Sequence, residues 1–241
     1  MKILLSPSKT KVLYGSPSEA VFHEPTTAAI VEHIQSLDEA TFAKALKLKG
    51  DKGAEWYSFY QSFATQPVGA AVQSYSGLAF KNLDWAGLND DAKLFGEAHL
   101  CILSALYGLV HPMSPIADYR LDFVDSIYKG YDTSLYDLWR ERVNEALASE
   151  DWLLNLASKE YSKLIDHPRM VTVEFLEHKN DVWKQLSTSS KQMRGRLAHY
   201  MLSSQAESWK QLPQEIDEFH LEGEIPSSIT EACTIVYKRQ A

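Results

Sequence analysis

Short apolar runs alternate with segments of helical period along this chain. The apolar runs predict strands at residues 2–6, 68–74, 100–104, 152–156, 170–176, 181–186 and 232–238. Apolar positions spaced three and four apart predict helices at about 26–36, 38–48, 54–64, 90–99, 134–148 and 189–203. The alternation is too irregular for a barrel of eight units. It predicts an α/β fold with a mixed β-sheet core surrounded by helices.

Two local patterns refine this prediction. Ser36 followed by Glu39 predicts a capping box at the start of the second helix. Residues 177–181, with Asn180 among them, separate two strand-like runs and predict a hairpin turn. Its antiparallel pairing would make the sheet mixed. Because no repeat or linker interrupts the pattern, we expect a single domain over residues 1–241.

Composition places the chain among ordinary globular proteins. It has 241 residues, of which 45% are hydrophobic and 23% are charged. Its apolar stretches are far shorter than the roughly 20 residues of a membrane span, so we expect no membrane association and a cytoplasmic location. Cys101 and Cys233 each fall in an apolar run, which predicts two buried thiols in a reducing compartment.

The charge distribution is uneven. The net charge of -8 opposes general attraction to nucleic acid or anionic membranes. Much of it comes from residues 207–231, where seven acidic residues face a single lysine. Residues 44–52 contain four lysines and one acid, and residues 184–196 contain four basic residues and no acid. Two basic segments therefore remain on an acidic chain.

Small polar residues follow three of the predicted strands, at Ser6, Ser104 and Asn155. If these strands are parallel neighbours, the loops that follow them converge at one edge of the sheet, where α/β proteins bind ligands. The loop after the third strand runs to residue 123 and contains Tyr107 and Arg120. The same loop is also compatible with a purely structural connection pinned by two prolines.

The first of these loops reads Ser6-Pro-Ser-Lys-Thr10. Its hydroxyls, ammonium group and backbone amides favour contact with an anion. Ser6 and Lys9 also have the spacing of a serine nucleophile with a lysine base, although that motif requires a helix start and two further motifs. Ser158, after the fourth strand, is suited to capping a short helix.

The predicted helix around Lys191–Tyr200 carries an apolar stripe of Met193, Leu197, Tyr200 and Met201. Lys191 and Arg194 lie on another face, where Arg194 is able to bind an anion or to pair with a carboxylate. Gly195 costs about 1 kcal/mol in a helix. It therefore predicts that another element or a phosphate approaches the backbone there.

Residues 46–54 form a glycine turn between two predicted helices. Lys47, Lys49, Gly50, Lys52 and Gly53 place lysines and backbone amides at the start of the second helix, where a phosphate is stabilised. The segment 38–64 resembles a helix-hairpin-helix module, with G-x-x-G in place of the usual G-x-G. A plain surface turn with solvated lysines is the alternative.

No metal or cofactor is predicted. The eight histidines are scattered without the spacing of metal ligands, and the two cysteines are far apart in the sequence.

Taken together, the motifs resemble the YaaA peroxide-stress protein family over nearly the whole chain. The matching pieces occur in the family's order: Ser6–Thr10, Tyr75–Leu78, Leu103–Gly108, Tyr119–Leu121, Leu135–Trp139, Asn155–Ser158, Glu160-Tyr161 and Arg194-Gly195. The resemblance implies a cytosolic protein induced by hydrogen peroxide that limits free intracellular iron. It also implies an α/β fold with a helix-hairpin-helix element and a positively lined cleft that binds duplex or branched DNA.

The chain departs from the family pattern at three places. Gln73-Ser74 replaces Gly-Asp, Val110-His111-Pro112 replaces Leu-Arg-Pro, and Asp118–Asp122 replaces Pro-Tyr-Arg-Leu-Glu. The cleft thereby loses an arginine and gains an acid, so we expect weaker DNA affinity than the resemblance implies.

Two hypotheses follow. In the first, the protein binds DNA without sequence specificity, through the turn described above and through Lys9, Arg120, Lys159, Lys191 and Arg194. In the second, it is an enzyme acting on a phosphate-bearing or nucleotide-like small molecule in the same cleft, by a reaction that the sequence does not name. The residues expected to line the cleft are Ser6, Ser8, Tyr75, Tyr107, Asn155, Ser158 and Tyr161.

Overall fold

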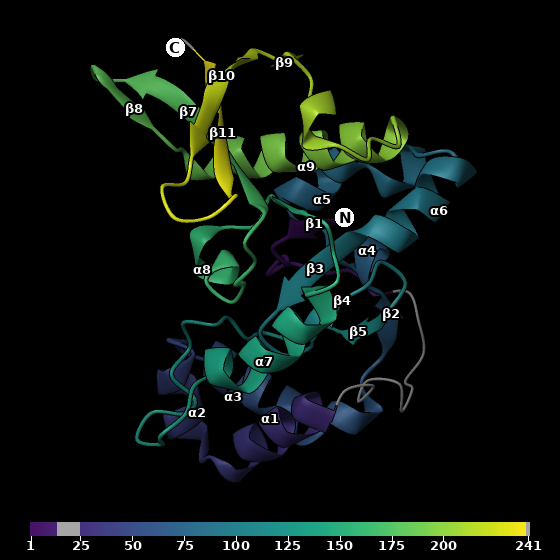
Figure 1. The fold of residues 1–241 in the computed structure, drawn as a ribbon. Helices are drawn as coiled ribbons and strands as arrows, with labels where there is room; N and C mark the ends of the chain where they lie inside the picture. The colour runs from purple at the N-terminus through teal and green to yellow at the C-terminus, as the bar shows by residue number, and fades with distance from the viewer. Residues whose placement is uncertain (14–24, 240–241) are drawn as a thin grey trace.

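A mixed β-sheet forms the centre of the protein. The computed structural model describes residues 1–13 and 25–239 (Figure 1). The sheet runs in the order β4-β3-β1-β6-β7-β11-β10-β9, with β8 paired to β7. Its central strands are parallel: β3 (Leu100–Ser104), β1 (Lys2–Leu5), β6 (Leu153–Asn155), β7 (Met170–Lys179) and β11 (Cys233–Arg239).

The remaining strands of this sheet pair antiparallel to their neighbours. They are β4 (Gly108–Val110), β8 (Val182–Lys184), β9 (Glu215–Ile216) and β10 (Phe219–Pro226). Asn180 and Asp181, both at positive φ, form the β7–β8 turn, as expected for a tight hairpin. The mixed α/β fold and this hairpin are therefore confirmed.

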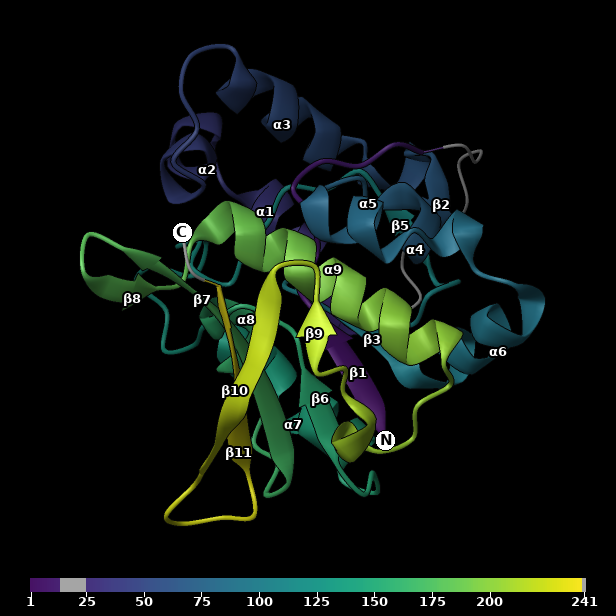
Figure 2. The ribbon, with the colours of Figure 1, turned by 90° about the horizontal axis from the view of Figure 1, so that it is seen from above.

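Helices cover both faces of the sheet. Figures 1 and 2 show α9 (Ser187–Ser203), α5 (Leu78–Leu83) and α6 (Asp90–His99) over one face, and α7 (Leu135–Leu147) on the opposite face. The remaining helices are α1 (Pro25–Ser36), α2 (Glu39–Ala45), α3 (Lys52–Gln61), α4 (Ala71–Ser74) and α8 (Lys159–Ser162). In α1, the Thr27 hydroxyl donates to the carbonyl of Leu106, just beyond β3. Figures 1 and 2 show that α1, α2 and α3 lie together beyond the carboxyl ends of the parallel strands β1 and β3.

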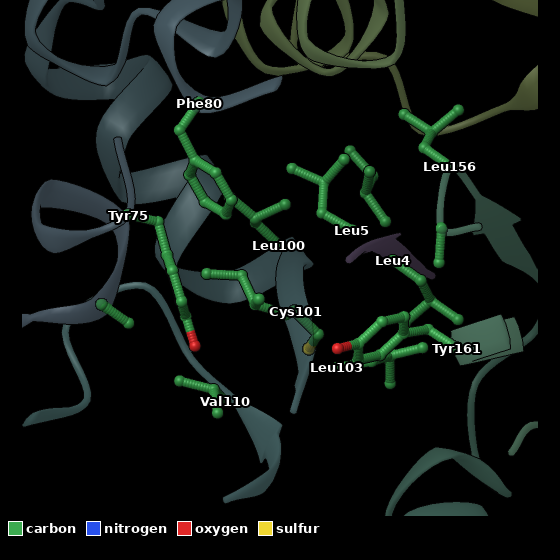
Figure 3. Close-up of a cluster of buried hydrophobic side chains, with 14 of the residues drawn as sticks. Leu4, Leu5, Tyr75, Phe80, Leu100, Cys101, Leu103, Val110, Leu156 and Tyr161 are labelled. Atoms are coloured by element: carbon green, nitrogen blue, oxygen red, sulfur yellow. The ribbon is translucent and has the colours of Figure 1, made fainter. Parts of the chain in front are cut away.

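The core explains why the central strands read as continuous apolar runs. Ile3, Leu4 and Leu5 are all buried, as are all five residues of β3, because helices pack on both faces of these strands. In Figure 3, Tyr75 and Phe80 lie to one side of Cys101, while Leu4 and Tyr161 lie to the other. Cys101 and Cys233 are buried free thiols, as predicted.

Three local predictions were wrong. The run at 68–74 forms strand β2 only over Val68–Ala70 and then turns into α4. Its partner β5 (Pro115–Ala117) begins at Pro115, which pairs with Ala70 and cannot donate a ladder hydrogen bond. Strand β2 therefore ends at Ala70.

Ser36 does not cap α2, because it still belongs to α1 and donates to the His33 carbonyl at 2.7 Å. Asp38 is the cap instead, and its carboxylate accepts the Thr41 N–H at 2.9 Å. Tyr200 leaves the apolar stripe of α9 and is 38% exposed, whereas Met193, Leu197 and Met201 are buried.

Candidate functional site

The loops after β1 and β6 meet because these strands are parallel neighbours. The Ser158 N–H donates to the Ser6 Oγ at 2.8 Å, and the Ser6 hydroxyl lies 3.3 Å from the Ser158 Oγ. Ser158 occupies the position before α8, but its side chain makes no capping hydrogen bond. Its hydroxyl instead joins the two strand ends.

A cavity of about 370 Å³ opens beside this junction. Helix α9 contributes Lys191 and Arg194, and the start of α5 contributes Gly77–Phe80. The predicted residues that line it are Ser6, Ser8, Lys9, Ser158, Tyr161, Lys191 and Arg194. The structure thus brings seven of the predicted residues around one space, which we call the β1–α9 cavity.

Asp122 is an acidic group in this cavity that the sequence did not single out as a binding residue. It is 9% exposed, its Oδ2 lies 2.7 Å from the Lys9 Nζ, and its Oδ1 accepts the Tyr161 hydroxyl at 2.9 Å. Burial and the Asp122 charge raise the pKa of Tyr161 well above its usual value, so Tyr161 is a neutral donor. Lys9 and Tyr161 therefore hold Asp122 in place.

Glu160 adds a second carboxyl group to the same wall. Burial, and next the neighbouring Asp122 charge, raise the pKa of Glu160 above its usual value. The cavity therefore holds acids as well as cations. The sequence around Glu160 did not indicate the raised pKa, because the shift depends on where the fold places Asp122.

Arg194 is positioned by the close packing of α9 on α5. An added Cβ at Gly195 would overlap the carbonyl oxygen of Ala79, so another element approaches this glycine, as expected. The Arg194 Nε is buried and has no hydrogen-bond partner in the described part of the chain. Burial lowers the pKa of Arg194, yet a guanidinium stays charged in proteins.

Three predicted cleft residues are buried away from the β1–α9 cavity. The Tyr75 hydroxyl lies 2.8 Å from that of Tyr119, and the Tyr107 hydroxyl accepts the Ala117 N–H at 3.0 Å. The side-chain oxygen of Asn155 accepts the Ala157 N–H at 3.0 Å. Tyr75 lines a separate, larger groove of about 670 Å³ between α4 and α6. These three side chains brace the loops around the cavity.

Two predicted cations lie at its margins. Lys159 is exposed and its Nζ lies 3.4 Å from the Glu174 carboxylate. It lines a shallow groove of about 340 Å³ together with Lys191 and Arg194. Arg120 lies beside Lys9, and its Nε is buried without a partner among the described residues.

Lys11 is a buried cation that no sequence pattern indicated. Its Nζ donates to the Tyr119 carbonyl at 2.6 Å, lies 4.1 Å from the Tyr119 ring centre and is 3.7 Å from the Asp118 carboxylate. Burial lowers the pKa of Lys11 to about 8. Asp118, the acid that this chain gains relative to the family pattern, thus pairs with Lys11, and Asp122 pairs with Lys9.

The lysine turn lies between α2 and α3. Lys47, Lys49 and Lys52 are exposed, and none of them forms an ion pair with another described residue. Gly50 has a φ of +59° and open space around it. A Cβ at Gly53 would lie 2.9 Å from the Ala43 Cβ, so the two helices are closely packed. The Gly53 N–H donates to the Gly50 carbonyl at 3.1 Å and is used within the turn.

The described residues, 1–13 and 25–239, contain no group of three or more His, Cys, Asp or Glu side chains placed to hold a metal ion. None of their helices is both long enough and apolar enough to cross a membrane.

Comparison with known proteins agrees with the motifs. A family model described as "Peroxide stress protein YaaA" matches residues 1–224. A UPF0246 protein of Finegoldia magna is 33% identical over 225 residues, which cover 88% of each chain. A UPF0246 protein of a Marinomonas species is 30% identical over 88% of each chain. A UPF0246 protein of Lactobacillus delbrueckii is 34% identical over 83% of this chain and 85% of its own. The chain therefore belongs to the YaaA peroxide stress protein family.

Proposed function

We propose that this protein acts in the cytoplasm during peroxide stress. In this proposal it binds DNA by contacting the phosphate backbone of the DNA, without sequence specificity. The family supports the stress-related role. The observation that carries DNA binding is the turn between α2 and α3, where Lys47, Lys49 and Lys52 are exposed without ion pairs to described residues.

The turn has the chemistry of a backbone contact. Its lysines are free to neutralise phosphates, and the open surroundings of Gly50 allow a strand to approach the main chain. Lys9 in the β1–α9 cavity and Lys159 at its margin contribute less to DNA binding in this proposal. Lys9 is paired with Asp122 and Lys159 with Glu174, so much of their charge is already neutralised. This agrees with the weaker DNA affinity expected from the sequence.

Limitation of free iron is the second part of the proposal, and the family resemblance alone supports it. The protein would act on iron levels without a resident iron site of its own. Metal analysis of the purified protein tests this, and iron bound in a fixed ratio to the chain would contradict it.

DNA binding is tested by titrating fluorescent duplex and four-way-junction DNA with the protein across a salt series. Each phosphate contact contributes about -0.9 to the slope of log K against log salt for duplex DNA. We expect K47E/K49E/K52E to weaken binding and to make the slope shallower by up to about 3.

The matched control is K163E/K179E/K210E, which changes the net charge by the same amount at three exposed lysines outside the turn. It tests whether the effect comes from the turn or from net charge alone. Equal losses in the two variants, or no binding of either DNA at low salt, would refute the proposed contact.

A further inference from the structure

The β1–α9 cavity holds a partly buried arginine, Arg194, that no described carboxylate pairs with. Arg194 forms no ion pair with the described residues, and its Nε has no hydrogen-bond partner. The carboxylate that acts on its charge belongs to Glu174, which already pairs with Lys159 at 3.4 Å. Holding a guanidinium largely out of water without a paired carboxylate is costly. An anionic ligand that enters the cavity would remove that cost.

Lys191 strengthens the attraction for an anion. It lies one helical turn before Arg194, and both side chains line the cavity from α9. A guanidinium offers paired N–H donors and an ammonium adds a point charge, which together suit a phosphate dianion. The hydroxyls of Ser6 and Ser158 also line the cavity, at the strand ends.

The acids of the cavity argue against a polyanion as its occupant. Asp122 and Glu160 line the same space and would repel a chain of phosphates. They would instead accept hydrogen bonds from hydroxyl or amino groups. Apolar side chains from Leu5, Leu78 and Phe80 supply contact for a carbon skeleton. The volume, about 370 Å³, lies within the range of small-molecule sites.

We propose that the β1–α9 cavity binds a small phosphate monoester that carries hydroxyl groups, such as a sugar phosphate or a nucleoside monophosphate. Its phosphate contacts Arg194 and Lys191, and its hydroxyls contact Asp122 and Glu160. The site is separate from the lysine turn, so the inference does not depend on DNA binding.

Isothermal titration of the full chain tests the inference, with ribose 5-phosphate, adenosine 5′-monophosphate, inorganic phosphate and adenosine as probes. We expect one of the two esters to bind with one molecule per chain, and more tightly than inorganic phosphate or adenosine. The better ester distinguishes a sugar phosphate from a nucleotide. Failure of both esters to bind, or binding no tighter than that of inorganic phosphate, would overturn the proposal.

Arg194→Gln tests the role of the guanidinium, and Arg196→Gln is its matched control. Arg196 lies on the same helix but pairs with Asp217 and does not line the cavity. We expect Arg194→Gln to weaken ester binding at least about tenfold, since it removes a charge-assisted contact, and Arg196→Gln to leave it nearly unchanged. Equal effects would overturn the assignment.

Two further variants keep the test decisive. Lys191→Gln changes an exposed side chain and should weaken ester binding severalfold even if Arg194→Gln fails to fold. K47E/K49E/K52E should retain full ester affinity whatever its effect on DNA. Loss of ester binding in that triple variant would count against a separate site. Unchanged ester affinity in Lys191→Gln would count against it as well.

Discussion

Gly195→Ala should destabilise the protein, although alanine is the better helix former. The new Cβ would overlap the Ala79 carbonyl oxygen and would lie 2.9 Å from the Ala79 carbonyl carbon and 3.0 Å from the Asn82 Cβ. Two of these three atoms belong to the backbone of α5. The overlap is therefore relieved only if α5 and α9 move apart.

The expected magnitude is the difference between two opposing contributions. Replacing glycine with alanine within a helix favours folding by about 1 kcal/mol. Overpacking costs about 1–3 kcal/mol, and a backbone overlap belongs at the upper end of that range. The net loss is then about 2 kcal/mol, which for a chain of this length lowers the melting temperature by about 4–8 °C.

Thermal unfolding followed by circular dichroism measures this shift. Thr188→Ala is the control, because Thr188 is exposed in the same helix and its replacement changes helix propensity without overlap. A Gly195→Ala protein as stable as the parent, or more stable, would refute the reasoning that close packing of α5 requires glycine.

Three further predictions concern buried polar groups. Tyr161→Phe removes the hydroxyl that donates to Asp122 at 2.9 Å and should lower the free energy of unfolding by about 1.5–3 kcal/mol. Urea unfolding measures this loss, and an unchanged midpoint would contradict it. The pKa of Lys11 is about 8 against 10.5 unfolded, so the unfolded chain binds more protons between these values and stability rises with pH there. Lys11→Met should abolish this gain in stability, which is about 3 kcal/mol. The difference in unfolding free energy between the parent and the variant should therefore change with pH, and a difference that is the same at every pH would contradict the prediction. Burial raises the pKa of Cys101 to about 12 and of Cys233 to about 11, so Ellman's reagent should label neither thiol before unfolding, and rapid native labelling would contradict this.

The central sheet could be predicted from sequence because its strands are buried on both faces. Continuous apolar runs such as 100–104 mark such strands. The strand β10 carried no such mark, because most of its residues are exposed and it includes Gly223. Helix α5 has six residues, too few to show a helical period. Both elements owe their structure to tertiary pairing.

The candidate site was predictable in part for a similar reason. Ser6 and Ser158 could be placed together because they follow parallel strands. Asp122 lies in a loop without period, and only the fold brings it to Lys9 and Tyr161. Asn155 has the chemistry of a binding residue, but its side chain bonds to Ala157 and Thr172. Side-chain direction at a strand end is not encoded in the strand pattern.

The position of β1 in the sheet also affects how the chain folds during synthesis. Residues 2–5 are made before their partners, because they pair with β3 from residue 100 and with β6 from residue 153. At typical ribosome speeds of about 5–20 residues per second, β1 waits roughly 5–20 s for its first partner and roughly 8–30 s for its second. Such distant pairing slows folding. During that interval an apolar segment of the nascent chain is exposed to chaperones and proteases.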